Sequence, residues 1–206
     1  MIAKISATEN LGGALGYNFK KVQHNEASVL CVNELREGFD GTYRIDKVLR
    51  DMQALIPEKC RTKKTVFHCS LNPHPDEKLS DEQLTQIAKE YMEALGYGKQ
   101  PYIVFKHHDI EREHIHIVSL RVNEQGEKIN DGFEKRRSKR ITDALEQKYG
   151  LIPSTPIQEQ VLQKASTKET LNESVENRKT KVEKVLRAVL AHYKFCLLYT
   201  SPSPRD

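Results

Sequence analysis

Two apolar stretches separated by only a few residues constrain the fold of this 206-residue chain more than any other feature. Residues 100–109, QPYIVFKHHD, and residues 114–122, HIHIVSLRV, are both typical of β-strands because β-branched and aromatic side chains are frequent in them. Two strands joined by so short a turn must pair antiparallel. The chain therefore contains a β-hairpin, and the other elements must pack around it.

Further strands and helices are predicted on both sides of this hairpin. Strands are expected at residues 2–7, 27–35 and 63–72, and helices at residues 9–21, 45–57, 80–95 and 134–151. The third of these helices has the clearest boundaries, because Ser80 and Gln83 fit a capping box and Gly96 or Gly98 ends the helix. Together the elements predict an α+β fold, a mainly antiparallel central sheet with helices on one face.

Histidines are concentrated in the hairpin: four of the eight in the chain lie within residues 107–118, HHDIEREHIHIV. Because side chains alternate along a strand, His114 and His116 share one face, about 6.5–7 Å apart. The preceding strand brings one of His107 or His108 alongside them. Three neutral imidazoles suit Zn²⁺, Mn²⁺, Co²⁺ or Ni²⁺ better than Mg²⁺. An exposed, histidine-containing edge without a ligand is the alternative interpretation.

The pattern from His107 and Asp109 to His114 and His116, followed by an apolar strand, resembles the third motif of conjugative relaxases. These are the HUH-type mobilisation nucleases of the MobA/VirD kind. The segments VFHCSLNPHPDEKLSDEQ and RVNEQGEKI resemble what precedes and follows that motif. The resemblance covers about residues 1–151 and implies a relaxase domain with an RRM-like palm. It also implies that His107, His114 and His116 bind a divalent metal ion, Mg²⁺ or Mn²⁺, with Zn²⁺, Co²⁺ or Ni²⁺ as alternatives, and that His108 lies outside the site.

A nucleophile is the second requirement of relaxase chemistry. Relaxases cut one DNA strand by tyrosine attack, which leaves a 5′-phosphotyrosine and a free 3′-hydroxyl. The family's nucleophile follows the first strand, so the resemblance implies Tyr17, in GALGYNFKK. The residues alone favour a packed aromatic at this position, and Tyr43 and His24 stay open as other nucleophiles. The function expected from the resemblance is metal-dependent, site- and strand-specific nicking at a plasmid or mobile-element transfer origin, which initiates conjugative mobilisation.

Residues that could contact DNA occur in two places. His68 and Ser70 share a face of one predicted strand, where they could reach the scissile phosphate or sugar, or could simply be exposed polar residues. The run KRRSKR, residues 135–140, holds five basic residues in six, and Arg137 and Arg140 lie on one helical face as candidate phosphate contacts. A solvated helix face explains the same run. The partners expected from the resemblance are single-stranded transfer-origin DNA, accessory mobilisation proteins and a coupling protein.

Other functions remain compatible with these residues. A rolling-circle replication initiator carries the same metal motif, and a three-histidine zinc hydrolase would use a metal-bound water without a covalent intermediate. A nucleic-acid-binding module without catalytic activity is a third alternative. The net charge of +4 permits nucleic-acid binding without requiring it, and the four cysteines show no CxxC pair that would indicate a zinc knuckle.

The ends of the chain bear on its organisation and location. The N-terminus lacks the apolar core of a signal peptide, and no uncharged run approaches membrane-spanning length, so a cytoplasmic protein without membrane insertion is expected. We expect a relaxase domain at residues 1–151 and a helical, truncated extension at residues 152–195. Residues 196–206, CLLYTSPSPRD, resemble translated adapter or vector sequence and are expected to be non-native.

Overall fold

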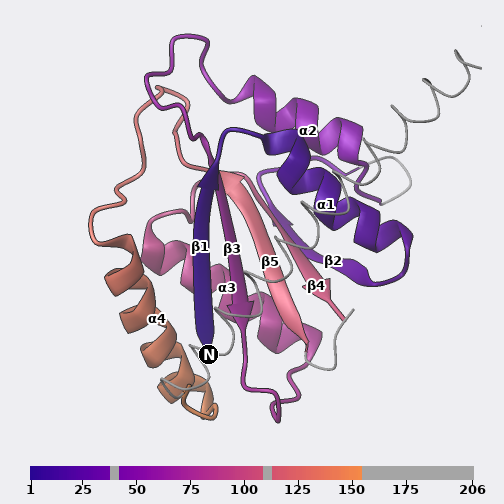
Figure 1. Cartoon of the computed structure of the whole chain (residues 1–206), viewed down its shortest axis with the longest axis vertical. Coiled ribbons are helices and arrows are strands. Elements are labelled where there is room, and N and C mark those ends of the chain that lie inside the picture. The colour runs from indigo at the N-terminus through magenta and orange to yellow at the C-terminus, as the bar shows by residue number, and fades with distance from the viewer. Residues whose placement is uncertain (38–41, 109–112, 155–206) are drawn as a thin grey trace, which may run out of the picture. The chain divides into compact units, whose positions relative to one another are not determined.

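The fold comes from a computed structural model that describes residues 1–37, 42–108 and 113–154 (Figure 1). Five strands and four helices lie in these ranges. In chain order they are β1 (Ile2–Thr8), α1 (Leu11–Gln23), β2 (Ala27–Asn33), α2 (Ile45–Ala54), β3 (Val66–Asn72), α3 (Asp81–Leu95), β4 (Tyr102–His107), β5 (His114–Leu120) and α4 (Glu134–Tyr149). The predicted α+β class is confirmed, with each expected element present and boundaries shifted by a few residues.

The strands form one sheet in the order β1-β3-β5-β4-β2, and every neighbouring pair is antiparallel. The predicted hairpin is the β4–β5 pair, in which His107 lies opposite His114. The central strand β5 has β3 on one side and β4 on the other, so its backbone is hydrogen-bonded along both edges. Residues at the start of β5 are therefore held on a rigid support.

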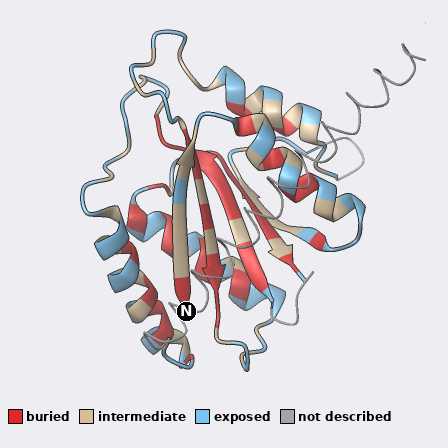
Figure 2. Cartoon of the chain, in the orientation of Figure 1, coloured by how far each residue is buried: buried red, intermediate tan, exposed pale blue. Residues whose placement is uncertain are grey.

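Helices cover both faces of the sheet, so the prediction of helices on one face was wrong (Figure 1). Helices α3 and α4 pack on the face that carries Phe67, Cys69 and Ile117. Helices α1 and α2 pack on the opposite face, against residues such as Phe105 and Val118. The physical reason lies in β4 and β5: apolar residues are consecutive at 102–105 in β4 and at 117–118 in β5, and a strand that is apolar on both sides must be covered on both. Figure 2 shows the resulting burial along the middle of the sheet.

The ends of α3 follow the predicted signals. The Ser80 side chain accepts a hydrogen bond from the backbone amide of Gln83, and the Gln83 side chain accepts one from the amide of Ser80 at 3.0 Å, which confirms the capping box. Gly96, and not Gly98, ends the helix in the left-handed conformation, with φ of 97°, which glycine adopts without steric cost. This helix supplies much of the core on its face of the sheet, including Leu84, Ile87, Tyr91 and Met92.

One compact unit spans Met1–Ser154. The predicted extension at residues 152–195 lies outside the described residues except for its first three positions, and the predicted non-native tail at residues 196–206 lies outside them entirely. Among the helices described, none has the length and apolar character needed to cross a membrane. Cys31, Cys60 and Cys69 are free thiols.

Candidate active site

Three histidines meet at one end of the β4–β5 pair. His107 is the last residue of β4 and His114 the first of β5, and His116 follows two positions later on the same face. The ring centroids are 5.2 Å apart for His107 and His114, 5.1 Å for His114 and His116, and 4.2 Å for the stacked pair His107 and His116. One nitrogen from each ring lies within 4.8 Å of the others. This histidine cluster, His107, His114 and His116, is the group that the family resemblance implied.

The cluster fits a metal ion. Ligand atoms about 2.1 Å from one cation lie roughly 3 Å apart, and the ligand nitrogens of the three histidines lie within 4.8 Å of one another, close enough to converge on one cation. Burial, followed by the nearby positive potential of His107, His68, His114 and Lys21, holds the pKa of His116 well below its ordinary value. His116 is therefore neutral near pH 7 and has a lone pair to donate. Because all three ligands are imidazoles, Mn²⁺, Zn²⁺, Co²⁺ and Ni²⁺ match the set better than Mg²⁺.

Two further side chains hold the histidines in place. His68, on β3, has its Nε2 3.0 Å from Nδ1 of His116, which leaves Nε2 of His116 for a metal. Burial lowers the pKa of His68, so this contact joins two neutral rings. On the other side, Nε2 of His107 lies 2.8 Å from Oδ1 of Asn18. Sequence reasoning missed Asn18, although its place directly after the candidate nucleophile in a helix with an apolar buried face could have drawn attention to it.

Tyr17 lies next to the histidine cluster. Its ring centroid is 6.1 Å from that of His107 and 6.2 Å from that of His116. The side chain is 36% exposed, in contrast to its helical neighbours Asn18 and Phe19, which are buried. Lys21, one turn further along α1, has its ammonium 5.2 Å from the Tyr17 ring, so positive charge lies beside the phenol. The expectation of a packed aromatic from residues alone therefore does not describe this side chain.

The other nucleophile candidates and His108 have different surroundings. His24 is exposed at the C-terminal end of α1. Tyr43 donates its hydroxyl to Glu37 at 2.6 Å, and burial and this carboxylate raise its pKa to about 12. A phenol held protonated in this way is a poor nucleophile at neutral pH. His108 has Nε2 3.1 Å from the carbonyl of Asn25, and it is not part of the histidine cluster.

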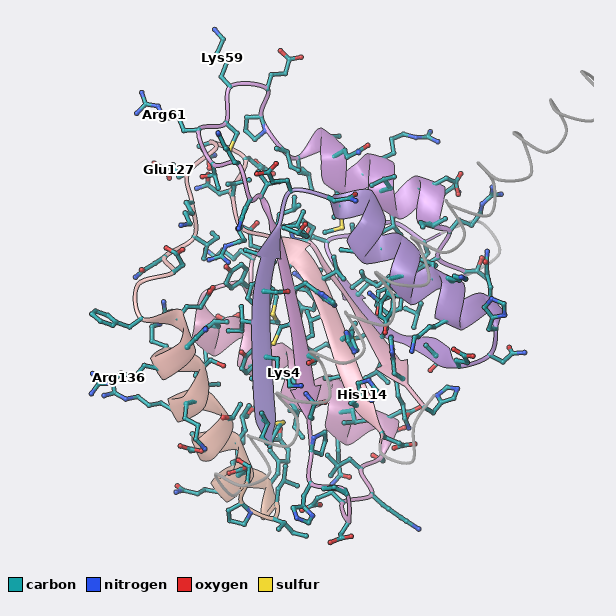
Figure 3. All side chains as sticks on the ribbon, in the orientation of Figure 1. Lys4, Lys59, Arg61, His114, Glu127 and Arg136 are labelled. Atoms are coloured by element: carbon teal, nitrogen blue, oxygen red, sulfur yellow. The ribbon has the colours of Figure 1, made fainter. Side chains whose placement is uncertain are left out.

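A row of polar side chains crosses the sheet beside the cluster. Lys4 on β1 lies opposite Ser70 on β3, and Ser70 lies opposite His116 on β5. Residues directly opposite one another in an antiparallel sheet share a face, so Lys4 and Ser70 are on the histidine side. Figure 3 labels Lys4 and His114 on this side of the sheet. The predicted DNA contacts His68 and Ser70 are thus brought to the cluster.

The two arginines predicted as phosphate contacts are not brought there. Both belong to α4, whose core residues pack with α3 on the opposite face of the sheet. The Arg137 guanidinium donates to the carbonyls of Leu95 and Asn130, each at 2.8 Å, so it closes the C-terminal end of α3. Arg140 is exposed, as is Arg136, which extends away from α4 in Figure 3.

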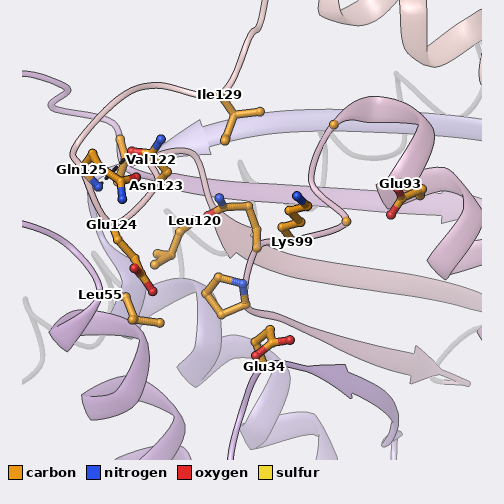
Figure 4. A pocket seen from close by; sticks show the side chains of 14 residues that line it. Glu34, Leu55, Glu93, Lys99, Leu120, Val122, Asn123, Glu124, Gln125 and Ile129 are labelled. Carbon is orange, nitrogen blue, oxygen red and sulfur yellow. Dashed lines mark hydrogen bonds between the residues drawn. The ribbon is translucent and has the colours of Figure 1, made fainter.

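A pocket of about 630 Å³ lies at the other end of the same strands (Figure 4). Its lining includes Gln100 and Pro101, just before β4, and Leu120, the last residue of β5. His107 and His114 stand at the opposite ends of these strands, roughly 20 Å away at about 3.3 Å per residue. The pocket therefore takes no part in the histidine site.

The fold and the cluster define a class: an α+β domain that holds a candidate metal centre and an exposed tyrosine on one end of an antiparallel sheet. The chain belongs to the relaxase family, because the profile of the MobA/VirD2-like relaxase nuclease domain matches residues 17–151. The chain is also 29% identical over 102 residues to Protein MobA of Acidithiobacillus ferrooxidans. That match covers 48% of this chain and 25% of the relative, so the chain spans only part of the relative's length. No solved structure gives a significant match.

Proposed function

We propose that this domain nicks one strand of DNA at the transfer origin of a plasmid or other mobile element by tyrosine transesterification, and so initiates mobilisation. The observation that carries the proposal is the approach of the Tyr17 ring to His107 and His116, at 6.1 and 6.2 Å between centroids. A three-histidine hydrolase uses a metal-bound water as its nucleophile and does not require a tyrosine at this position. Family membership supports DNA as the substrate, and a rolling-circle initiator is a close relative of this function.

In this proposal Tyr17 is the nucleophile and the histidine cluster provides the metal ligands. The phenol of Tyr17 loses its proton, and its oxygen attacks the scissile phosphorus. A bond forms between phosphorus and the tyrosine oxygen while the bond to the 3′ oxygen breaks. That oxygen takes up a proton and leaves as a 3′-hydroxyl, and the 5′ end stays on Tyr17. The histidine cluster would hold a divalent cation, whose charge would polarise the phosphate and offset its developing negative charge.

Recognition of the DNA is proposed for the polar row on the histidine face. Ser70 and Lys4 offer a hydroxyl and an ammonium in line with His116, which suits a phosphate backbone leading to the metal. His68 contacts His116, so we assign it to holding that ring and to the edge of the DNA site. Arg137 and Arg140 would contact phosphates only if the DNA ran along α4, on the opposite face of the sheet. Accessory mobilisation proteins and a coupling protein are the protein partners proposed from the family.

The test is a covalent-adduct assay. The protein is incubated with single-stranded DNA covering the transfer origin of its own element, with Mn²⁺ or Mg²⁺, and the mixture is denatured in SDS. We expect an SDS-resistant protein–DNA complex with wild type and none with Tyr17→Phe. Tyr43→Phe is the matched control, because it removes one hydroxyl from another tyrosine on the same side of the sheet.

The outcomes separate the alternatives. An adduct that persists in Tyr17→Phe and disappears in Tyr43→Phe would move the nucleophile to Tyr43. Cleavage by both variants without any adduct would favour a hydrolase that uses a metal-bound water. Binding of DNA without cleavage, unchanged by metal, would indicate a module with no catalytic role.

A further inference from the structure

Asn18 is fully buried on α1, and the other buried side chains of this helix are apolar. Its exposed fraction is 0%, and Leu15 and Phe19 on the same helix are core residues. Burying a carboxamide costs free energy unless its polar atoms find partners, and an apolar side chain would carry no such cost. Asn18 does find partners: Ala14 on one side and His107 on the other.

The orientation of the amide follows from the Ala14 contact. Nδ2 of Asn18 lies 2.8 Å from the backbone carbonyl of Ala14, one turn earlier in α1. A carbonyl oxygen only accepts hydrogen bonds, so the amide nitrogen must face Ala14 and the amide oxygen must face His107. This fixes which end of the side chain meets the imidazole.

The state of His107 follows in turn. Oδ1 of Asn18 only accepts, and it lies 2.8 Å from Nε2 of His107, so Nε2 must carry the proton and donate it. In a neutral imidazole the second nitrogen then holds the lone pair. His107 is thereby set to coordinate a cation through Nδ1, and Nε2 is closed to it.

We propose that Asn18 is a positioning residue that selects the tautomer of His107 with its proton on Nε2 and its lone pair on Nδ1, and that links the helix carrying the candidate nucleophile to this metal ligand. Asn18 is the residue after Tyr17, so one hydrogen bond fixes the ligand and the helix that carries the candidate nucleophile relative to each other. The inference rests on the proposed function only in taking the histidine cluster as a metal site. It assigns a role that the ligands and the tyrosine do not fill.

The first experiment measures metal binding without DNA. Asn18→Leu removes both polar atoms and keeps the branched shape of the side chain. Isothermal titration with Mn²⁺ or Co²⁺ should show a dissociation constant raised about 10- to 100-fold, the usual effect of losing a partner of a metal-bound histidine. Asn18→Asp keeps an oxygen toward His107 and should restore most of the affinity. Asn33→Leu is the matched control: Asn33 donates to the carbonyls of Gly98 and Gln100, away from the histidines, and its loss should leave the affinity unchanged.

The second experiment observes the tautomer directly. In ¹⁵N-labelled, metal-free protein, two-bond ¹⁵N–¹H correlations of the imidazoles should show His107 with the proton on Nε2, and Asn18→Leu should lose this preference. A proton on Nδ1 in wild type, or unchanged metal affinity in a folded Asn18→Leu protein, would overturn the proposal. Neither measurement involves nicking. Failure of the Tyr17→Phe test would therefore sink the nucleophile and leave the role of Asn18 standing.

Discussion

The two sides of strand β5 have opposite tasks. On the side of α3 and α4, Ile115 and Ile117 are fully buried in an uninterrupted apolar core. On the other side, Val118 and Leu120 pack against α1 and α2, whereas His114 and His116, near the start of the strand, belong to the histidine cluster. Successive residues at the start of the strand thus alternate between the candidate metal site and the apolar core. This separation follows from the two-residue period of a β-strand, in which successive side chains point to opposite faces.

The two sides also differ in how burial affects their ionisable groups. Beneath α3, burial raises the pKa of the Cys69 thiol to about 12 and keeps it uncharged. At the histidine end, burial lowers the pKa of His68 and His116 and keeps them uncharged as well. The same desolvation gives an inert thiol on one side and imidazoles with available lone pairs on the other. Burial favours the neutral form of both groups: the neutral thiol is a poor nucleophile, whereas the neutral imidazole is the form that binds a metal.

The largest effect is expected from His116→Ala on the chemical side. Loss of a ligand removes charge stabilisation of several kcal/mol, so nicking should fall by about three orders of magnitude. His108→Ala is the control, because His108 lies on the same hairpin and bonds to Asn25 outside the cluster. Rates are measured with labelled single-stranded DNA at saturating Mn²⁺. Equal losses in both variants would mean that the hairpin as a whole, and not the histidine cluster, supports cleavage.

The adjacent substitution Ile117→Ala should produce the reverse result. Removing a fully buried isoleucine side chain costs about 2–5 kcal/mol of unfolding free energy, because a cavity replaces packed methyl groups. Urea denaturation followed by circular dichroism measures the loss. Metal affinity of the folded fraction should stay at the wild-type level. A weakened metal site in this variant, at a temperature where it is fully folded, would show that the two sides of β5 are coupled.

The sequence predicted two things about this strand. Its alternation indicated which residues share a face, and its motif indicated which histidines form the cluster. Alternation alone placed His114 and His116 together and the isoleucines opposite them, and the turn length alone required an antiparallel hairpin. Alternation and turn length could not decide whether His107 or His108 joins that pair, because the two residues are adjacent at the end of a strand. The family spacing indicated His107, and the structure places that residue in the cluster.

Contacts between distant segments were the part that could not be predicted. The pairing of β3 with both β1 and β5 joins residues far apart in the chain, and only that pairing brings Ser70 and Lys4 into line with His116. Consecutive apolar residues in β4 and β5 identify strands, but only the folded sheet shows that helices cover both faces of them. The basic run in α4 was predicted to contact DNA, but it lies on the face opposite the histidine cluster. The density of charge in a sequence does not indicate which face of the sheet a helix will cover.

A smaller effect is expected from acid on the metal-free protein. The pKa values of His68 and His116 are lowered in the folded state from an ordinary 6.5, so the unfolded chain binds protons that the folded chain does not. Unfolding free energy should therefore be fully retained above about pH 7 and fall as the pH drops through 6.5 toward the lowered values. The double variant His68→Gln/His116→Gln should flatten this slope, and Tyr91→Phe, on the other face, should leave it unchanged. An identical acid slope in the double variant would contradict the assignment.

The smallest expected effect distinguishes the two sides as surfaces for DNA. Lys4 belongs to the polar row beside His116, and Arg140 is exposed on α4, which packs on the opposite face. If the strand follows the histidine face, Lys4→Gln should weaken binding of single-stranded DNA and lower the salt slope of the binding constant by about 0.7, the value for one lost phosphate contact. Arg140→Gln should change neither quantity. Fluorescence anisotropy over a range of salt concentrations measures both, and the reverse result would place the DNA along α4, so that the strand must cross the edge of the sheet at β1 to reach Tyr17.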